Sequence, residues 1–133
     1  MRVVDTNIVA YLLIAGDCTE AAQALWQVDR DWRSDAFFRI EFSNLLATQV
    51  RAKALTLAEA VGLLNAAAAS VPIVIDVPDV DALRTAHSFG VSAYDARFLA
   101  AAQALGTKLV TEDSRLRKAA PGLTLSLAEA LAG

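Results

Sequence analysis

The chain opens with a short apolar segment, Val3-Val4, that runs directly into three polar residues, Asp5-Thr6-Asn7, and then into a helical pattern. An apolar run this short is typical of a strand buried on both faces, as in a parallel sheet. In open α/β sheets, ligands bind beyond the carboxyl ends of the strands. Asp5, which follows the strand directly, is therefore a candidate site residue.

Short apolar segments alternate with helical segments along the rest of the chain. Further strands are predicted at Trp32–Phe37, Ile73–Val77, Lys108–Thr111 and Leu123–Leu125. Helices are predicted at Glu20–Val28, Arg39–Ala52, Leu57–Ala69, Val80–Phe89, from Ser92 to Gly106, from Glu112 to Pro121 and after Ser126. This alternation predicts an α/β fold, with a mainly parallel central sheet flanked by helices, in a single domain of residues 1–133.

Capping signals mark several of the predicted helix starts. Asp17 or Thr19 is expected to cap the helix Glu20–Val28. The segments Thr56–Glu59, Ser92–Asp95 and Ser126–Glu129 have the pattern of capping boxes, in which two side chains each satisfy a free backbone N–H.

Composition excludes several classes of protein. The chain has 133 residues, of which 56% are hydrophobic and 20% charged, as expected of a globular domain. Its net charge of −3 is not that of a general nucleic-acid binder, so any contact with a polyanion requires a local basic patch or bound cations. No apolar run reaches the ~18 residues of a membrane-spanning helix. With a single cysteine, Cys18, no intrachain disulfide is possible, and we expect a soluble cytoplasmic protein without membrane contact.

Four acids lie just after predicted strands or at predicted helix starts, namely Asp5, Glu41, Asp95 and Asp113. Each of them has an ordinary explanation. Asp5 and Asp113 suit helix N-caps, Glu41 suits a first helical turn, and Asp95 suits the third position after the capping residue Ser92.

Together, the four acids indicate more than capping. The carboxyl ends of parallel strands meet at one edge of a sheet. Two carboxylates held ~5 Å apart would repel by roughly 3 kcal/mol at an effective dielectric constant of 20. A fold gathers such charge when a proton or a cation offsets it, and carboxylates without nearby His or Cys suit a hard cation such as Mg²⁺ or Mn²⁺.

Other reactive groups favour no competing chemistry. His87 is the only histidine, so a zinc site is not expected. Cys18 has no histidine near it in the sequence and is interpreted as an inert thiol. The segment Gly106-Thr107-Lys108 lacks the upstream glycine of a P-loop. Several arginines and lysines could form an anion-binding groove, but the sequence does not choose among them.

Four segments, taken in order, resemble the motifs of PIN domains. Val3-Val4-Asp5-Thr6-Asn7 resembles the opening motif, and Glu41 in Arg39–Asn44 resembles the second acid. Ser92–Ala102 is similar to the third motif, and Leu109–Leu116 to the fourth. No single motif is very specific, but the set of four covers nearly the whole chain. In its small, single-domain layout the chain resembles the VapC toxins of bacterial VapBC toxin–antitoxin pairs.

The resemblance implies a ribonuclease that depends on Mg²⁺ or Mn²⁺. Asp5, Glu41, Asp95 and Asp113 would hold the metal, which activates water for attack on an RNA phosphodiester and stabilises the charge that develops. Thr6 and Asn7 would orient Asp5 or the water, and Thr111 would support the site. Glu112 adds an acid beside Asp113 and could be a ligand in its place or along with it.

The resemblance also implies a homodimer and a small cognate antitoxin that covers the site. The alanine-rich hairpin from Arg39 to Ala69 is the surface expected to contact either partner. Three alternatives stay open: a non-toxin nuclease that acts on DNA or structured nucleic acid, a binding module with a decayed site, and a phosphoacceptor signalling domain. The last fits poorly, because Lys108 begins its predicted strand instead of following it.

Overall fold

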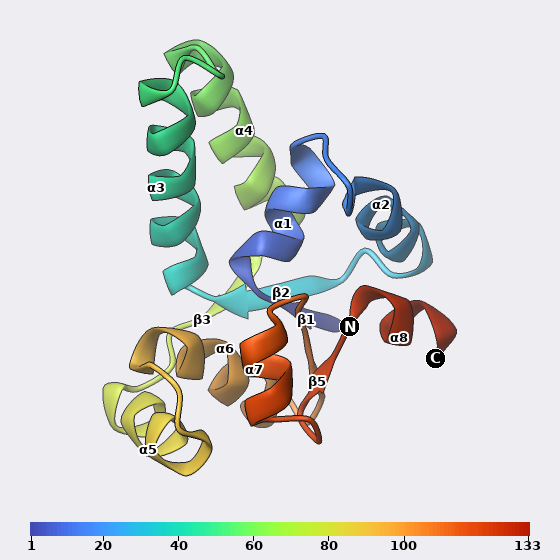
Figure 1. The fold of residues 1–133 in the computed structure, drawn as a ribbon, viewed down its shortest axis with the longest axis vertical. Coiled ribbons are helices and arrows are strands. Elements are labelled where there is room, and N and C mark those ends of the chain that lie inside the picture. The colour runs from blue at the N-terminus through green and yellow to red at the C-terminus, as the bar shows by residue number, and fades with distance from the viewer.

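The computed structural model describes residues 1–133 and contains one five-stranded sheet with the order β3-β2-β1-β4-β5 (Figure 1). Its strands are β1 Arg2–Val4, β2 Trp32–Asp35, β3 Ile73–Ile75, β4 Leu109–Val110 and β5 Thr124–Leu125. All neighbouring strands pair in parallel, and Val3 of β1 lies opposite Arg33 of β2 and Leu109 of β4. The predicted α/β fold with a parallel sheet is thus confirmed.

The sheet order reverses between β1 and β4. From β1 the chain adds β2 and β3 on one side, then returns to place β4 and β5 on the other. In doubly wound sheets this switch point opens a crevice at the carboxyl ends of the two central strands. The residues that follow β1 and β4 are Asp5 and Thr111, so the switch point falls at the predicted site.

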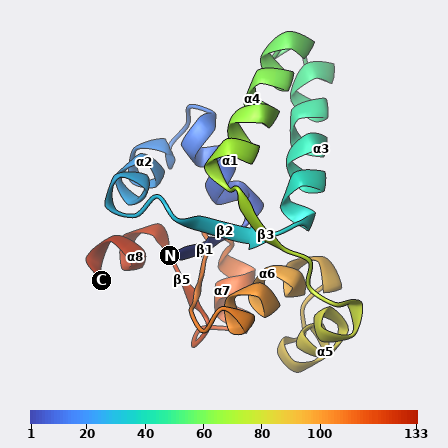
Figure 2. The same ribbon diagram turned by 180° about the vertical axis from the view of Figure 1, so that it is seen from behind.

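Helices cover both faces of the sheet. They are α1 Thr6–Leu13, α2 Thr19–Val28, α3 Phe37–Arg51, α4 Leu57–Ser70, α5 Asp79–Phe89, α6 Ala93–Ala104, α7 Ser114–Ala119 and α8 Leu127–Ala132. Figures 1 and 2 show α1 to α4 on one side of the sheet and α5 to α7 on the other. The pair α3 and α4 forms the predicted helical hairpin, which extends away from the sheet. None of the helices combines the length and apolarity needed to cross a lipid bilayer.

The core lies between the central strands and the helices on either side of them. Val3, Val4, Leu109 and Val110 have no exposed surface, as expected of strands covered on both faces. Residues 98–102 of α6 are also buried, because this helix packs across β1, β2 and β4. Burying one large apolar side chain contributes about 1.5–3 kcal/mol to the stability of the fold. The buried face of α6 therefore holds the first turn of this helix in place relative to the strand ends.

The predicted caps are partly confirmed. Thr56 with Glu59 and Ser126 with Glu129 form complete capping boxes. The prediction for α2 was wrong: its N-cap is Cys18, which makes no side-chain cap bond. The Thr19 hydroxyl is used in the preceding turn, where it accepts from the Gly16 N–H and donates to the Ile14 carbonyl.

The box predicted for α6 is only half formed. Ser92 accepts a hydrogen bond from the backbone N–H of Asp95, but the Asp95 carboxylate returns none to the Ser92 backbone. A reciprocal bond would have pinned that carboxylate against its own helix start. Its absence leaves the Asp95 carboxylate available for other contacts.

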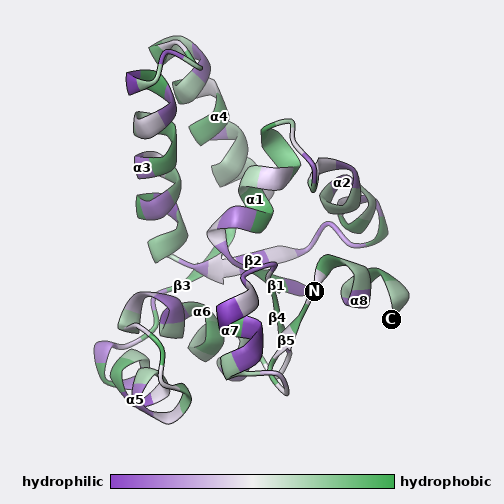
Figure 3. Cartoon of the chain, viewed as in Figure 1, coloured by the Kyte–Doolittle hydropathy of each residue, from purple (hydrophilic) through white to green (hydrophobic).

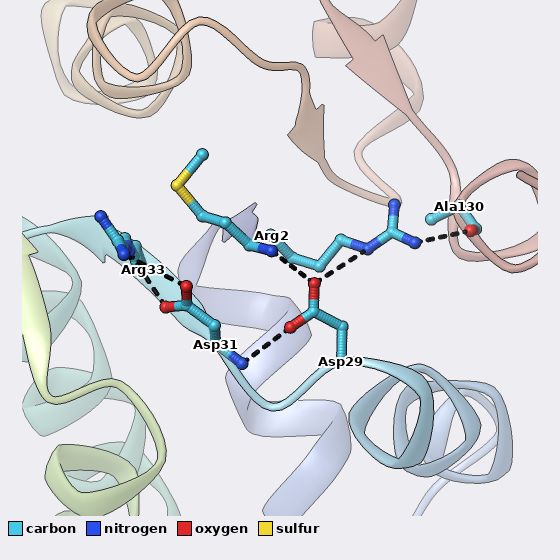
Figure 4. A network of polar contacts seen from close by, with 6 residues as sticks. Arg2, Asp29, Asp31, Arg33 and Ala130 are labelled. Atoms are coloured by element: carbon cyan, nitrogen blue, oxygen red, sulfur yellow. Dashed lines mark hydrogen bonds and ion pairs between the residues drawn. The ribbon is translucent and has the colours of Figure 1, made fainter.

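A network of charged residues ties the amino end of β1 to its neighbours (Figure 4). Asp29, just after α2, pairs with the amino group of Met1 and more distantly with Arg2, which also donates to the Ala130 carbonyl of α8. The hydrogen bond from the amino group is the main cause that lowers the pKa of Asp29 below its ordinary value. The Arg2 charge is therefore partly neutralised at the amino end of β1, away from the residues that follow the strands.

Candidate active site

One cavity of about 220 Å³ brings the four predicted acids together beyond the carboxyl ends of the strands. Its lining residues are Asp5, Thr6, Asn7, Glu41, Asn44, Leu45, Asp95, Phe98, Asp113 and Leu116. The acids come from four separate elements: the end of β1, α3, the first turn of α6 and the start of α7. Figure 3 shows hydrophilic colouring at the start of α1 and on α7, two of the elements that contribute lining residues.

Asp5 is placed by the transition from β1 to α1. It is the N-cap of α1, and its Oδ1 accepts a hydrogen bond of 3.2 Å from the Ile8 N–H. Its Oδ2 accepts a hydrogen bond from the Thr111 hydroxyl, at the end of β4. Asp5 therefore caps α1 and lines the cavity at the same time, and only 8% of it is exposed.

Glu41 is held by a hydroxyl from α1. The Thr6 Oγ1 donates a hydrogen bond of 2.6 Å to Glu41 Oε1, which joins the first turn of α1 to α3. Thr6 was expected to orient Asp5 or the water. The Thr6 hydroxyl instead donates its hydrogen bond to Glu41. Asn7 lines the cavity with an exposed side chain that makes no hydrogen bond within the protein.

Asp113 is the N-cap of the short helix α7. Its Oδ1 accepts from the N–H groups of Arg115 and Leu116, at 2.9 and 3.3 Å. Its own N–H donates to the Thr111 Oγ1 at 3.1 Å. The Thr111 hydroxyl therefore bridges two of the acids, since it also donates to Asp5.

Glu112 lies in a different environment from Asp113. Its Oε2 accepts a hydrogen bond of 2.9 Å from the Leu127 N–H, at the start of α8, and it is not among the residues that line the cavity. Thr111 lies between the two regions with no exposed surface. Of the two neighbouring acids, the structure brings Asp113 into the cavity with Asp5.

The electrostatics of the cavity favour protons or cations. The pKa of Asp5 is raised to about 7, chiefly by burial and also by the charges of Glu41 and Asp113, while the hydrogen bonds from Thr111 and from the Ile8 N–H oppose the rise. Burial and the charge of Asp95 raise the pKa of Glu41. Burial and the charge of Asp113 raise the pKa of Asp95, while nearby Arg115 lowers it. None of the four acids takes part in an ion pair.

The donor set fits a hard divalent cation, since it offers four carboxylates without His or Cys. No ion pair within the chain offsets the charge of buried Asp5, which is a second reason to expect a cation there. As they stand, however, no three of the acidic, His or Cys side chains converge closely enough to enclose an ion. Each carboxylate of Asp5, Glu41 and Asp113 is instead held by its own hydrogen bonds.

Four lining residues were not among the predicted site residues: Asn44, Leu45, Phe98 and Leu116. Asn44 lies three residues after Glu41 on α3, and Phe98 lies three residues after Asp95 on α6. Residues three apart share a helix face, so the helical period applied to each acid would have identified both. Phe98 was predicted only as an apolar residue of its helix.

Comparisons with known proteins agree with this fold. The family model for the PIN domain matches residues 2–121. Among solved structures, the chain is similar to the crystal structure of PAE2754 from Pyrobaculum aerophilum, with a TM-score of 0.79 and 22% sequence identity over 98% of this chain and 92% of that chain. At this identity the likeness supports the fold alone. No curated protein matches the chain.

Proposed function

Since the chain belongs to the PIN-domain family, we propose that it is an Mg²⁺- or Mn²⁺-dependent ribonuclease and the toxin of a type II toxin–antitoxin pair. PIN domains are generally metal-dependent nucleases, which supports the reaction class. The observation that carries the proposal is the cavity in which Asp5, Glu41, Asp95 and Asp113 meet without a cationic partner.

The protein's own groups divide the work of such a reaction. Asp5, Glu41, Asp95 and Asp113 would hold the ion, and the ion when bound would supply Lewis-acid stabilisation of phosphate charge and an activated water. Thr111 fixes the Asp5 carboxylate, and Thr6 fixes Glu41. These two hydroxyls keep the carboxylates in place before substrate arrives, which lowers the cost of reorganisation during the reaction.

Arg115 is the cation best placed to meet the substrate. It lies in the first turn of α7, it is exposed, and it forms no ion pair. It is the only cation whose charge lowers the pKa of Asp95. By contrast, Arg2, Arg33, Arg97 and Arg117 each pair with an acid outside the cavity. We assign Arg115 to a phosphate beside the cut bond.

The choice of RNA rests on the resemblance to small toxin-like PIN domains. Two alternatives compete: a non-toxin PIN nuclease that acts on DNA or structured nucleic acid, and a binding module whose site has decayed. All four acids line the cavity, which argues against decay. The net charge of −3 fits an enzyme that releases its product, since a tight grip on phosphates needs many free cations.

Cleavage assays test the reaction class directly. Labelled RNA and DNA of one sequence would be incubated with purified protein and Mg²⁺, Mn²⁺ or EDTA, beside the variants Asp5→Asn and Asp17→Asn. Asp17 is an exposed acid outside the cavity and serves as the control. We expect metal-dependent cutting of RNA by the wild type and Asp17→Asn alone. Cutting that survives Asp5→Asn would indicate a contaminating nuclease, and cutting of no nucleic acid would favour the binding module.

The toxin role requires an antitoxin, and we propose that it binds along the α3–α4 hairpin. A groove of about 370 Å³ runs between these helices, with seven apolar residues among its nine lining residues. Leu57 and Val61 are 70% and 49% exposed. The same surface is the candidate contact of a homodimer.

Growth arrest on expression tests the toxin role, and its relief by the product of a small neighbouring reading frame tests the antitoxin. Expression of Asp5→Asn should not arrest growth. Leu57→Asp combined with Val61→Asp should keep catalysis and lose antitoxin binding. Its elution in size-exclusion chromatography, compared with the wild type, then shows whether the hairpin also forms the dimer.

A further inference from the structure

Two aromatic rings stack beside Phe98, a residue that lines the acidic cavity. The rings of Phe37 and Tyr94 lie 5.2 Å apart between centroids with an interplanar angle of 14°. Phe37 begins α3 and Tyr94 lies in the first turn of α6, so the stack joins two helices that each carry an acid of the site. We call this pair the aromatic platform.

The platform lies beside the acids. Tyr94 directly precedes Asp95, and Phe37 lies four residues before Glu41 on the same helix face. Phe98 connects the platform to the cavity, since it lines the cavity and its ring centroid is 6.5 Å from that of Phe37. The platform is therefore about one helical turn from Glu41, which is ~5.4 Å along the axis.

Core packing does not account for Tyr94. Its neighbour Phe98 is 2% exposed, but Tyr94 is 64% exposed although Phe37 covers part of it. An aromatic ring left mostly in water contributes little to the hydrophobic core, because that contribution scales with the area buried. Its exposed face remains available to another flat group.

We propose that an unpaired base of the nucleic-acid substrate stacks on Tyr94 while the adjoining phosphate enters the acidic cavity. The inference rests on the proposed nuclease function and adds a residue, Tyr94, that contacts the base beside the cut. Bases splayed out of a single strand stack on aromatic side chains, whereas bases within a duplex already stack on one another. Because every base has a flat face, the platform selects for lack of pairing and only weakly for sequence.

Binding to a non-cutting protein tests the platform. The Asp5→Asn protein would be titrated, at Mg²⁺ concentrations high enough to occupy the three remaining carboxylates, against a fluorescent single-stranded RNA and against the same strand in a duplex. We expect the single strand to bind more tightly. In this background Tyr94→Ala should weaken single-strand binding about tenfold, while Tyr94→Phe and Tyr94→Trp should retain it. Val28→Ala, which changes a side chain of similar exposure on α2, should have no effect.

Tyr94→Leu separates stacking from packing. Leucine keeps an apolar contact with Phe37 but has no flat face, so a stacking role predicts the behaviour of Tyr94→Ala, and a packing role that of Tyr94→Phe. Thermal melting of each variant shows that it is folded.

The inference is overturned if Tyr94→Ala binds like the parent protein, if the duplex binds as well as the single strand, or if no nucleic acid binds. Cleavage by the wild type reports on the proposed function separately, because a protein that cuts RNA equally well with Tyr94→Ala is a nuclease without this platform.

Discussion

The Thr111 hydroxyl donates a hydrogen bond to Asp5 Oδ2, and this bond joins the ends of the two central strands across the switch point of the sheet. The same oxygen accepts from the N–H of Asp113. One buried hydroxyl thereby fixes the distance between two of the four acids. It also stabilises the charged form of Asp5, since the bond lowers the pKa of that carboxyl.

Thr111→Val should lower cleavage about ten- to a hundredfold, the usual effect of removing a group that orients a metal ligand. Valine has nearly the same shape, so the protein should stay folded. Without the hydroxyl the pKa of Asp5 rises further, and the acidic limb of the pH–rate profile should move to higher pH. Thr85→Val, at a position 9% exposed on α5, is the matched control. An unchanged profile would mean that Thr111 does not tune Asp5.

Asp5→Asn should abolish cleavage and raise stability at pH 8 in the absence of divalent metal. The pKa of Asp5 is about 7 in the folded protein against an ordinary value of 3.8. The folded state therefore holds a proton that the unfolded chain has lost, so the contribution of Asp5 to stability falls as pH rises from 3.8 to 7. The full difference is on the order of 4 kcal/mol as an upper limit. Urea unfolding at pH 5 and pH 8 measures it, and equal stability of both proteins at pH 8 would contradict the burial of an uncompensated charge.

Divalent metal should stabilise the wild type more at pH 8 than at pH 5. Below its folded pKa of about 7, Asp5 carries a proton that competes with the ion. With Mg²⁺ at about 100 times its Kd, the free energy of unfolding should rise by about 2.7 kcal/mol, and EDTA should reverse the gain. Thermal melting with Mg²⁺, Mn²⁺ and no metal provides the measurement. Asp5→Asn should lose most of the stabilisation, and a gain that persists in that variant would place the ion elsewhere.

Asp113→Asn should lower the rate of cleavage, whereas Glu112→Gln should leave it unchanged. Asparagine can still cap α7, so Asp113→Asn removes one charge from the cavity with little structural loss, and cleavage should fall at least tenfold. Glutamine can still accept from the Leu127 N–H, so Glu112→Gln should cleave like the wild type. Initial rates over a range of Mg²⁺ concentrations distinguish the two. The assignment of Asp113 fails if Glu112→Gln is the variant that needs more metal.

His87→Ala should leave cleavage within about twofold of the wild type. His87 is exposed near the end of α5 and does not line the cavity. Its only expected contribution is an interaction with the helix dipole, which is about 0.3–1 kcal/mol when the ring is charged. The rate measured from pH 5.5 to pH 8 provides the check. A large loss would require a general acid or base in addition to the carboxylates.

The order of strands and helices was predictable because each segment carries its own periodicity and stop signals. Gly90, for example, ends α5 with a φ of 68°, where glycine has no steric penalty. The residue at which β2 ends could not be predicted in this way. The strand stops at Asp35, whose carboxylate accepts from the N–H groups of Val77 and Phe37. One of those donors is 42 residues away in the sequence, so no local pattern encodes the bond.

The site was predictable in its acids and less so in the groups that hold them. Asp5 and Asp113 follow strands directly, and parallel strands bring such positions to one edge. The contact between Thr6 and Glu41 spans 35 residues, and it depends on how α1 packs beside α3. The stack of Phe37 on Tyr94 likewise depends on the relative placement of α3 and α6, which residue spacing does not determine.

The switch in strand order has a consequence during synthesis. The chain emerges from the ribosome with Asp5 first, but its hydrogen-bonding partner Thr111 is 106 residues later. Until β4 has been made and inserted beside β1, the first carboxylate has neither this hydroxyl nor the fourth acid beside it. Three of the acids thus leave the ribosome in a chain that has no assembled centre. We expect the nascent protein to have no nuclease activity until its last fifth has folded into place.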